Sequence, residues 1–320
     1  MNERERYESV RGCKWVDEVV EDAPYVTTLE IMDQYGCEVC IHGDDLSIGA
    51  DGRDTYQIVK DAGRFVECRR TQGVSTTELV GRMLLMSKDH SEPIEDEQSI
   101  DEDGKVECKK AKVENFAGNN PKSPYTAGVS HFLTTSKRVL QFSNSKEPQS
   151  GDRVIYADGG FDLYHLGHIE FLREAKKMGD YLLVGVHDDE AIRKVRGPNF
   201  PLMSLNERVL SVLSCRYVDE VVIGAPYSVT KDVLEKIYQV SVVAHGINSA
   251  LPDSNDQDPY KLPKELGIYK SIDTQYSNIT YNTIIERICK NRLAYEERNR
   301  KKEAKELAAI EAANQKASEL

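Results

Sequence analysis

Length, composition and charge exclude several classes of protein for this chain. It has 320 residues, of which 39% are hydrophobic and 30% charged, and its formal net charge is −12. This acidic balance disfavours a nucleic-acid-binding protein, whose domain is usually basic. No apolar run approaches the roughly 18 residues that span a bilayer, the first residues lack an apolar signal segment, and seven scattered cysteines are typical of reduced thiols. We therefore expect a cytoplasmic protein with no nucleic-acid partner and no stable membrane insertion.

The chain repeats part of its own sequence. Arg11–Thr28 (RGCKWVDEVVEDAPYVTT) matches Leu213–Thr230 (LSCRYVDEVVIGAPYSVT), and the match continues through the His-Gly pairs at 42–43 and 245–246. The two copies are offset by about 200 residues, whereas the units of a solenoid span about 20–50 residues. The repeat therefore indicates a duplicated domain and not a solenoid. The second copy extends back to Val154, whereas the first copy reaches the first residue almost at once. We therefore expect the first copy to be truncated, lacking its first half.

The segment between the copies has the composition of a linker. The stretch from Asp89 to Asp103 is acidic and holds no Lys or Arg, and clustered charge with low hydrophobicity leaves too little apolar surface to offset chain entropy. The end of the chain is rich in Ala, Glu, Lys and Arg, which is typical of a solvated helix. The expected organisation is a partial N-terminal domain at 1–87, a linker at 88–150, a second domain at 151–291 and a charged helical tail at 292–320.

In the second copy, apolar runs that predict strands alternate with amphipathic runs that predict helices. In chain order, these are a strand at 153–158, a helix at 165–179, a strand at 181–189, a helix or loop from 190, a helix at 205–215, a strand at 220–227, a helix at 229–238, a strand at 240–246 and a helix at 281–293. Such alternation indicates a doubly wound, Rossmann-like α/β domain with a parallel sheet. Ligands of such sheets bind at the carboxyl ends of the strands, where this sequence gathers His and Asp residues.

The segment Asp158–His168 (DGGFDLYHLGH) carries the clearest chemistry. His165 and His168 are three residues apart, so they lie on one face of the first turn of the predicted helix. The free N–H groups of that turn favour a phosphate, and imidazoles beside it can stabilise negative charge that grows in a transition state. The motif therefore predicts a polyphosphate site. The alternative is that the two histidines only cap the helix.

An HxGH motif at a strand-to-helix turn resembles the signature of the nucleotidylyltransferase superfamily. CRYVDEVVIGAPYSVT and AHG are similar to the choline- and ethanolamine-phosphate cytidylyltransferases, and two tandem copies with the tail NRLAYEERNRKKEAKELA resemble the ethanolamine-phosphate family. The resemblance implies two nucleotidylyltransferase domains that transfer a cytidylyl group from CTP to phosphoethanolamine in phosphatidylethanolamine biosynthesis. No carboxylate cluster in the sequence forms a metal cage, so Mg²⁺ is expected to arrive with CTP.

Two other functions stay open at this stage. One is a cytidylyltransferase for another phospho-alcohol, such as phosphocholine, although the tandem copies argue against it. The other is a catalytically impaired chain that binds and regulates a longer form of the enzyme, because the first copy lacks the HxGH segment. A homodimer also stays open.

The resemblance further implies roles for individual residues of the second copy. The catalytic set is His165, His168 and Arg196, the last standing where the family generally has a Lys. The ammonium end of the substrate is expected at Asp158 and Tyr227. CTP is expected to contact the following residues: Gly160, Phe161, Asp162, His245, Gly246, Ile247, Asn248, Ser277, Asn278, Ile279, Thr280 and Tyr281.

The first copy keeps a different part of the machinery. Its RTQGVSTT segment resembles the family's CTP motif RTxGxSTT, in which an Arg, a Gly turn and hydroxyl side chains meet phosphate at a helix N-terminus. The same motif is degenerate in the second copy. The CTP-binding residues implied for the first copy are His42, Gly43, Asp44, Asp45, Arg70, Thr71, Gly73, Val74, Ser75, Thr76 and Thr77.

Overall fold

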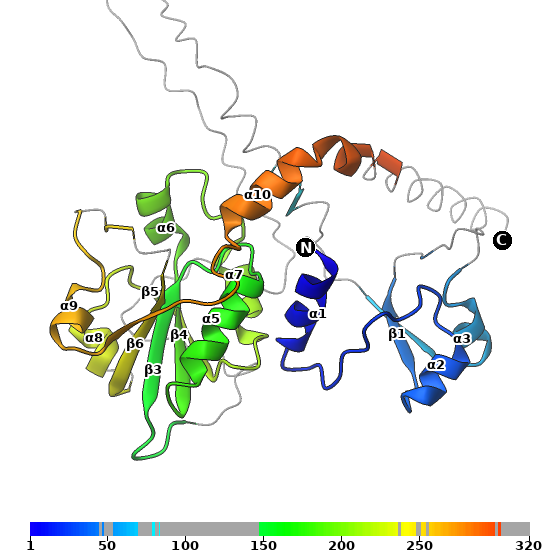
Figure 1. Cartoon of the computed structure of the whole chain (residues 1–320), viewed down its shortest axis with the longest axis horizontal. Helices are drawn as coiled ribbons and strands as arrows, with labels where there is room; N and C mark the ends of the chain where they lie inside the picture. Colours follow the sequence, from blue (N-terminus) through cyan, green and yellow to red (C-terminus); the bar gives the residue numbers. More distant parts are fainter. Residues whose placement is uncertain are drawn as a thin grey trace, which may run out of the picture. The chain divides into compact units, whose positions relative to one another are not determined.

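The computed structural model describes two compact units of the chain (Figure 1). The described residues are 1–44, 47, 54–69, 79–80, 83, 147–235, 238–247, 251–253, 256–297 and 300–301. The first unit takes in Met1–Arg11 and Val16–Gly81, and the second takes in Gly12–Trp15 and Arg82–Leu320. Nearly all of the predicted linker and most of the predicted tail lie outside the described residues, so the proposed domain boundaries stay a prediction.

The second unit is built on a parallel sheet of five strands in the order β5-β4-β3-β6-β7. The strands are β3 Val154–Gly159, β4 Tyr181–His187, β5 Glu220–Ala225, β6 Val240–Gly246 and β7 Tyr269–Ile272. This arrangement confirms the predicted α/β class with a parallel sheet. The central strand β3 lies between β4 and β6, so the chain reverses its winding direction beside β3, which is where such sheets bind ligands.

Helices cover both faces of this sheet (Figure 1). Helices α5 Leu166–Lys176 and α7 Leu205–Leu213 cover one face, and α8 Lys231–Glu235 and α9 Lys261–Glu265 cover the other. The unit also contains α6 Asp189–Arg196 and α10 Tyr281–Lys290, and α10 packs against α5. Because successive strand residues point to opposite faces, Ile155 and Ala157 pack with α5 and α7, whereas Val154 and Tyr156 pack with α8. In the described part of the chain, no helix has both the length and the apolar character needed to cross a membrane.

The described part of the first unit repeats one edge of that architecture on a smaller scale. It contains α1 Glu3–Arg11, α2 Leu29–Gln34, β1 Cys40–Gly43, α3 Gln57–Asp61 and β2 Phe65–Cys68. Strands β1 and β2 are parallel, with the register His42 opposite Glu67 and Gly43 opposite Cys68. In the second unit, β6 and β7 pair His245 with Ser271 and Gly246 with Ile272 in the same way.

Side-chain contacts around the two edges also correspond. The Tyr56 ring lies 4.5 Å from the His42 ring, and the Tyr260 ring lies 4.4 Å from the His245 ring. The duplication read from the sequence is therefore present in strand register and in side-chain packing.

Candidate active site

A cavity of about 400 Å³ opens at the carboxyl ends of the strands in the second unit. Nearly all of the site residues predicted in the second copy line it. These are Asp158, Gly160, Phe161, Asp162, His165, His168, Arg196, Tyr227, His245, Gly246, Ile247, Ser277, Ile279, Thr280 and Tyr281. Asn278 is exposed and is not part of the lining, and Asn248 lies outside the described residues.

The two histidines of the HxGH motif cap helix α5 and also line the cavity. The His165 Nδ1 atom accepts a hydrogen bond from the Gly167 N–H at 3.1 Å, and the His165 N–H donates to the His168 Nδ1 atom at 3.3 Å. Their rings stack with centroids 3.9 Å apart. The two histidines therefore cap the helix, as the alternative interpretation expects, and they also line the cavity.

The capping bonds fix the tautomer of both rings. An Nδ1 atom that accepts a hydrogen bond carries no proton, so each neutral ring carries its proton on Nε2. Burial lowers the pKa of His165 to about 4 and lowers the pKa of His168 well below its ordinary value, with His165 and Arg196 lowering the latter further. Both imidazoles are therefore neutral near pH 7, and each has an Nε2–H group to donate.

The glycine inside the motif lets a second chain segment approach the histidines. A Cβ atom at position 167 would lie 2.8 Å from the Ile279 carbonyl oxygen, so only Gly fits there. The approaching segment leads into helix α10, whose N-cap Thr280 accepts a hydrogen bond from the Thr283 N–H at 3.4 Å. Thr280 and Tyr281 line the cavity. The first turns of α5 and α10 therefore both border it, as suits a ligand with several phosphates.

Arg196 brings a positive charge to the same cavity. It is the last residue of helix α6, and its guanidinium lies over the Tyr281 ring at 4.7 Å from the ring centroid. Tyr281 is held in turn by the Phe200 ring, with centroids 5.1 Å apart. Stacking on an aromatic face suits the planar guanidinium, so Arg196 has an aromatic partner in the cavity wall.

Asp158, the last-but-one residue of β3, is the most deeply buried carboxylate in the cavity wall. One of its oxygens accepts a hydrogen bond from the Tyr260 hydroxyl at 2.7 Å, and the other, Oδ2, finds no partner among the described residues. Burial raises the pKa of Asp158 from 3.8 to about 7, although the Tyr260 hydroxyl opposes the shift. A buried, unsatisfied oxygen favours binding of a group that donates hydrogen bonds or carries positive charge.

Aromatic rings and a second pair of histidines surround Asp158. Tyr227 places its ring 5.2 Å from the His187 ring and donates its hydroxyl hydrogen to the Leu251 carbonyl at 3.0 Å. Burial lowers the pKa of both His187 and His245 to about 4. Tyr260 is not predicted as a site residue from the sequence, whereas His187 is among the His and Asp residues expected at the carboxyl ends of the strands, without a role of its own. The repeat marks Tyr260, because Asp258-Pro259-Tyr260 matches Asp54-Thr55-Tyr56.

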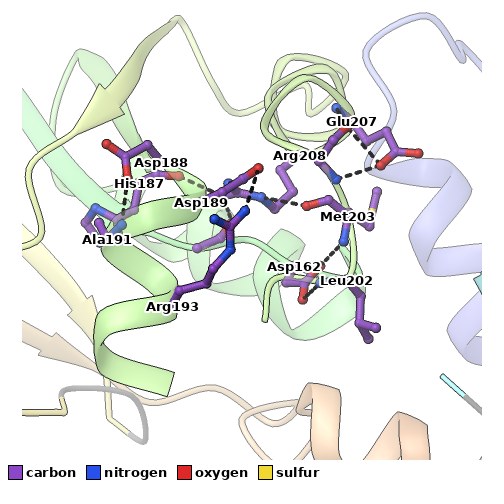
Figure 2. Close-up of polar contacts among 12 residues, drawn as sticks. Asp162, His187, Asp188, Asp189, Ala191, Arg193, Leu202, Met203, Glu207 and Arg208 are labelled. Atoms are coloured by element: carbon purple, nitrogen blue, oxygen red, sulfur yellow. Dashed lines mark hydrogen bonds and ion pairs between the residues drawn. The ribbon is translucent and has the colours of Figure 1, made fainter. Parts of the chain in front are cut away.

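A buried arginine holds the walls of the cavity together (Figure 2). Arg208 of α7 is fully buried, and its guanidinium donates to the carbonyl oxygens of Gly160 at 2.6 Å, His187 at 2.8 Å and Met203 at 3.1 Å. It also forms an ion pair with Asp189 at 2.6 Å. The loops after β3 and β4 and the entry to α7 are thereby joined through one side chain, which the sequence analysis does not assign to the site.

Asp162 has a related structural role in the same network (Figure 2). Its carboxylate accepts hydrogen bonds from the backbone N–H groups of Leu202 at 2.8 Å and Met203 at 2.9 Å, and from that of Leu163 at 3.1 Å. Both carboxylate oxygens are therefore engaged in shaping the loop. A direct contact of this carboxylate with CTP stays a prediction.

Most of the site predicted in the first copy lies outside the described residues: Asp45, Arg70, Thr71, Gly73, Val74, Ser75, Thr76 and Thr77. His42 and Gly43 end strand β1, and Asp44 follows them. Within the described ranges, no three His, Cys, Asp or Glu side chains are grouped as they would be around a metal ion.

Comparison with known proteins identifies the family. A cytidylyltransferase-like family model matches residues 1–82 and 156–284. An ethanolamine-phosphate cytidylyltransferase from Dictyostelium discoideum is 52% identical over 98% of this chain and 84% of its own length. The Mus musculus protein of the same name is 50% identical over 98% of this chain and 80% of its own length. Choline-phosphate cytidylyltransferase A from Rattus norvegicus is 38% identical over only 45% of this chain and 39% of its own length. This chain therefore belongs to the ethanolamine-phosphate cytidylyltransferase family.

Proposed function

We propose that the cavity of the second unit transfers a cytidylyl group from CTP to phosphoethanolamine, giving CDP-ethanolamine and diphosphate. The observation that carries the proposal is the composition of one cavity wall. It combines two Nε2–H donors and a guanidinium, which suit phosphates, with a buried carboxylate oxygen that lacks a partner among the described residues, which suits an ammonium group. The phosphate and the amine of phosphoethanolamine require these two kinds of group.

The reaction needs no nucleophile from the protein. A phosphate oxygen of phosphoethanolamine attacks the α-phosphorus of CTP, a new oxygen–phosphorus bond forms, and the bond to the bridging oxygen of the diphosphate breaks. His165 and His168 would donate their Nε2–H groups to phosphate oxygens, on which negative charge grows as diphosphate leaves. Arg196 would supply a full positive charge, and the capped first turns of α5 and α10 would orient backbone N–H groups.

Among the residues that the structure describes, no ready-made set of protein ligands is placed to hold Mg²⁺. The carboxylate oxygens of Asp162 already accept backbone N–H groups, and Asp189 is paired with Arg208. The described residues therefore fit a metal ion that arrives on the triphosphate. Bound in that way, it would neutralise phosphate charge.

Selectivity for ethanolamine follows from the chemistry proposed at Asp158. A primary ammonium can donate hydrogen bonds to the Asp158 carboxylate, whereas the trimethylammonium of phosphocholine cannot, and the unsatisfied acceptor then costs about 1–3 kcal/mol. Tyr227 would add a cation–π contact with either amine. Phosphoethanolamine is therefore the favoured substrate.

The proposal is tested by measuring kcat/KM for both amines with CTP. We expect the kcat/KM for phosphoethanolamine to exceed that for phosphocholine by about 5-fold to 150-fold in the unaltered chain, as the cost above implies. In Asp158→Asn the advantage should shrink. Equal values for the two amines in the unaltered chain would remove the ethanolamine assignment. The absence of any transfer to either amine would overturn cytidylyl transfer itself.

A further inference from the structure

Two cysteines from matching places in the repeated sequence lie opposite each other in the second unit. Gly12–Trp15 belongs to that unit, although the residues on either side of it in the sequence do not. Its Cys13 forms an isolated antiparallel bridge with Cys215, which lies just beyond the end of α7. Both side chains are free thiols. Neither is used in the proposed reaction.

The backbone around the bridge places these cysteines in a register that a disulfide can span. The Lys14 N–H donates to the Ser214 carbonyl at 2.8 Å, and the Arg216 N–H donates to the Gly12 carbonyl at 2.9 Å. These two bonds flank the cysteines, which therefore form a non-hydrogen-bonded pair, in which opposite Cα atoms lie about 4.5 Å apart. That separation falls within the range of roughly 4.4–6.8 Å found across disulfides.

The two thiols differ in access, and cations lie beside them. Cys13 is partly exposed, whereas Cys215 is only 1% exposed. Lys14 interacts electrostatically with both sulfur atoms, and Arg216 acts on Cys215 in the direction that favours its thiolate. Burial nevertheless raises the pKa of Cys215. A reagent from solution therefore reaches Cys13 first, and Cys215 is placed to react in the second step.

We propose that Cys13 and Cys215 form a reversible disulfide by exchange with a small oxidised disulfide of the glutathione type. The Cys13 thiolate attacks the small disulfide, which breaks its sulfur–sulfur bond and releases one small thiol. The Cys215 thiolate then attacks the Cys13 sulfur of the mixed disulfide and releases the second small thiol. Two protein thiols are oxidised by two electrons, and one small disulfide is reduced to two thiols.

The bond would tie Gly12–Trp15 covalently to the turn that follows α7. Because the two cysteines are far apart in sequence, the cross-link closes a long loop and restricts the unfolded chain. The oxidised chain should therefore unfold at a higher urea concentration than the reduced chain. Arg216 already holds the same segment, since its side chain donates to the Cys13 carbonyl at 3.1 Å.

The experiment exposes the full chain to oxidised glutathione, blocks the remaining thiols, and analyses tryptic peptides by mass spectrometry. We expect a peptide that joins Gly12–Lys14 to Val209–Arg216, which disappears after reduction with dithiothreitol. Cys68→Ser, which changes an exposed cysteine, should retain both the joined peptide and the shift in the urea midpoint. Cys13→Ser should lose both.

Two results would overturn the proposal. One is a chain in which Cys13 stays as a mixed disulfide with glutathione while Cys215 stays a free thiol. The other is a joined peptide that links either cysteine to a different partner. Both results are measured on the unaltered chain, so neither depends on whether a Cys215 variant folds.

Discussion

Replacing Asp158 by Asn measures what the burial of this carboxylate costs the folded chain. The side chain is 3% exposed, one oxygen accepts a hydrogen bond from Tyr260 at 2.7 Å, and Oδ2 has no partner among the described residues. Burial raises its pKa from 3.8 to about 7. Asn has nearly the same shape and does not ionise, so the substitution removes the titration while largely preserving the packing.

The sign of the effect follows from proton linkage. Between pH 3.8 and about 7, the folded chain keeps a proton on Asp158 that the unfolded chain has released, so the free energy of unfolding falls as the pH rises. Each unit of pKa difference corresponds to about 1.4 kcal/mol. From pH 5 to pH 8 the wild-type chain should therefore lose roughly 3 kcal/mol from this group. The Asn variant should not.

The assay is urea unfolding of both chains at pH 5 and pH 8. The amide nitrogen that Asp158→Asn introduces lowers the free energy of unfolding by about 1–3 kcal/mol at every pH if it stays unpaired. The test is therefore how the difference in the free energy of unfolding between the two chains changes from pH 5 to pH 8. Asp256→Asn, at an exposed position with a φ of 58° that Asn tolerates, serves as a control. A difference between wild type and Asp158→Asn that stays constant from pH 5 to pH 8 would refute a desolvated Asp158.

Three further predictions concern the same cavity. Asp158 must be ionised to pair with an ammonium group, so the wild-type kcat/KM for phosphoethanolamine should decrease as the pH is lowered below about 7. The Asp158→Asn variant should lose this pH dependence and have a kcat/KM lower on the order of 10²-fold. A variant with the same pH profile as the wild type would contradict this. Arg196→Ala should lower kcat on the order of 10²–10³-fold, whereas Lys194→Ala, an exposed neighbour on α6, should leave kcat unchanged. Arg208→Lys should lower the free energy of unfolding by about 3–5 kcal/mol in a urea titration, because it breaks a buried charged network. A decrease in the free energy of unfolding of less than about 1 kcal/mol would show that Lys replaces the guanidinium contacts.

The central part of the fold could be predicted because its strands are buried on both faces. The runs at 154–159 and 181–187 are almost continuously apolar, which is typical of strands inside a parallel sheet. The edge strand β7 (YKSI) and the helix α9 (KLPKE) were not predictable from the sequence pattern. Only one residue in each is buried, both are short, and α9 contains a proline, so neither has a periodic pattern to read.

The candidate site could be predicted where one continuous segment carries it. The pair His165 and His168 is visible in HxGH because helix geometry alone brings the two rings together. Tyr260 reaches Asp158 across 102 residues of sequence, and Arg208 reaches Gly160 across 48. Such contacts depend on the order of strands in the sheet, so local spacing does not reveal them.

The most direct test of the account separates the two roles of His165. Asn is among the best N-cap residues, so His165→Asn should retain the cap of α5 and the fold while removing the Nε2–H donor. Diphosphate release from CTP and phosphoethanolamine is measured alongside thermal unfolding. We predict an unchanged unfolding temperature with a kcat lower on the order of 10²–10³-fold. An unchanged kcat in this well-folded variant would contradict catalysis in the cavity of the second unit.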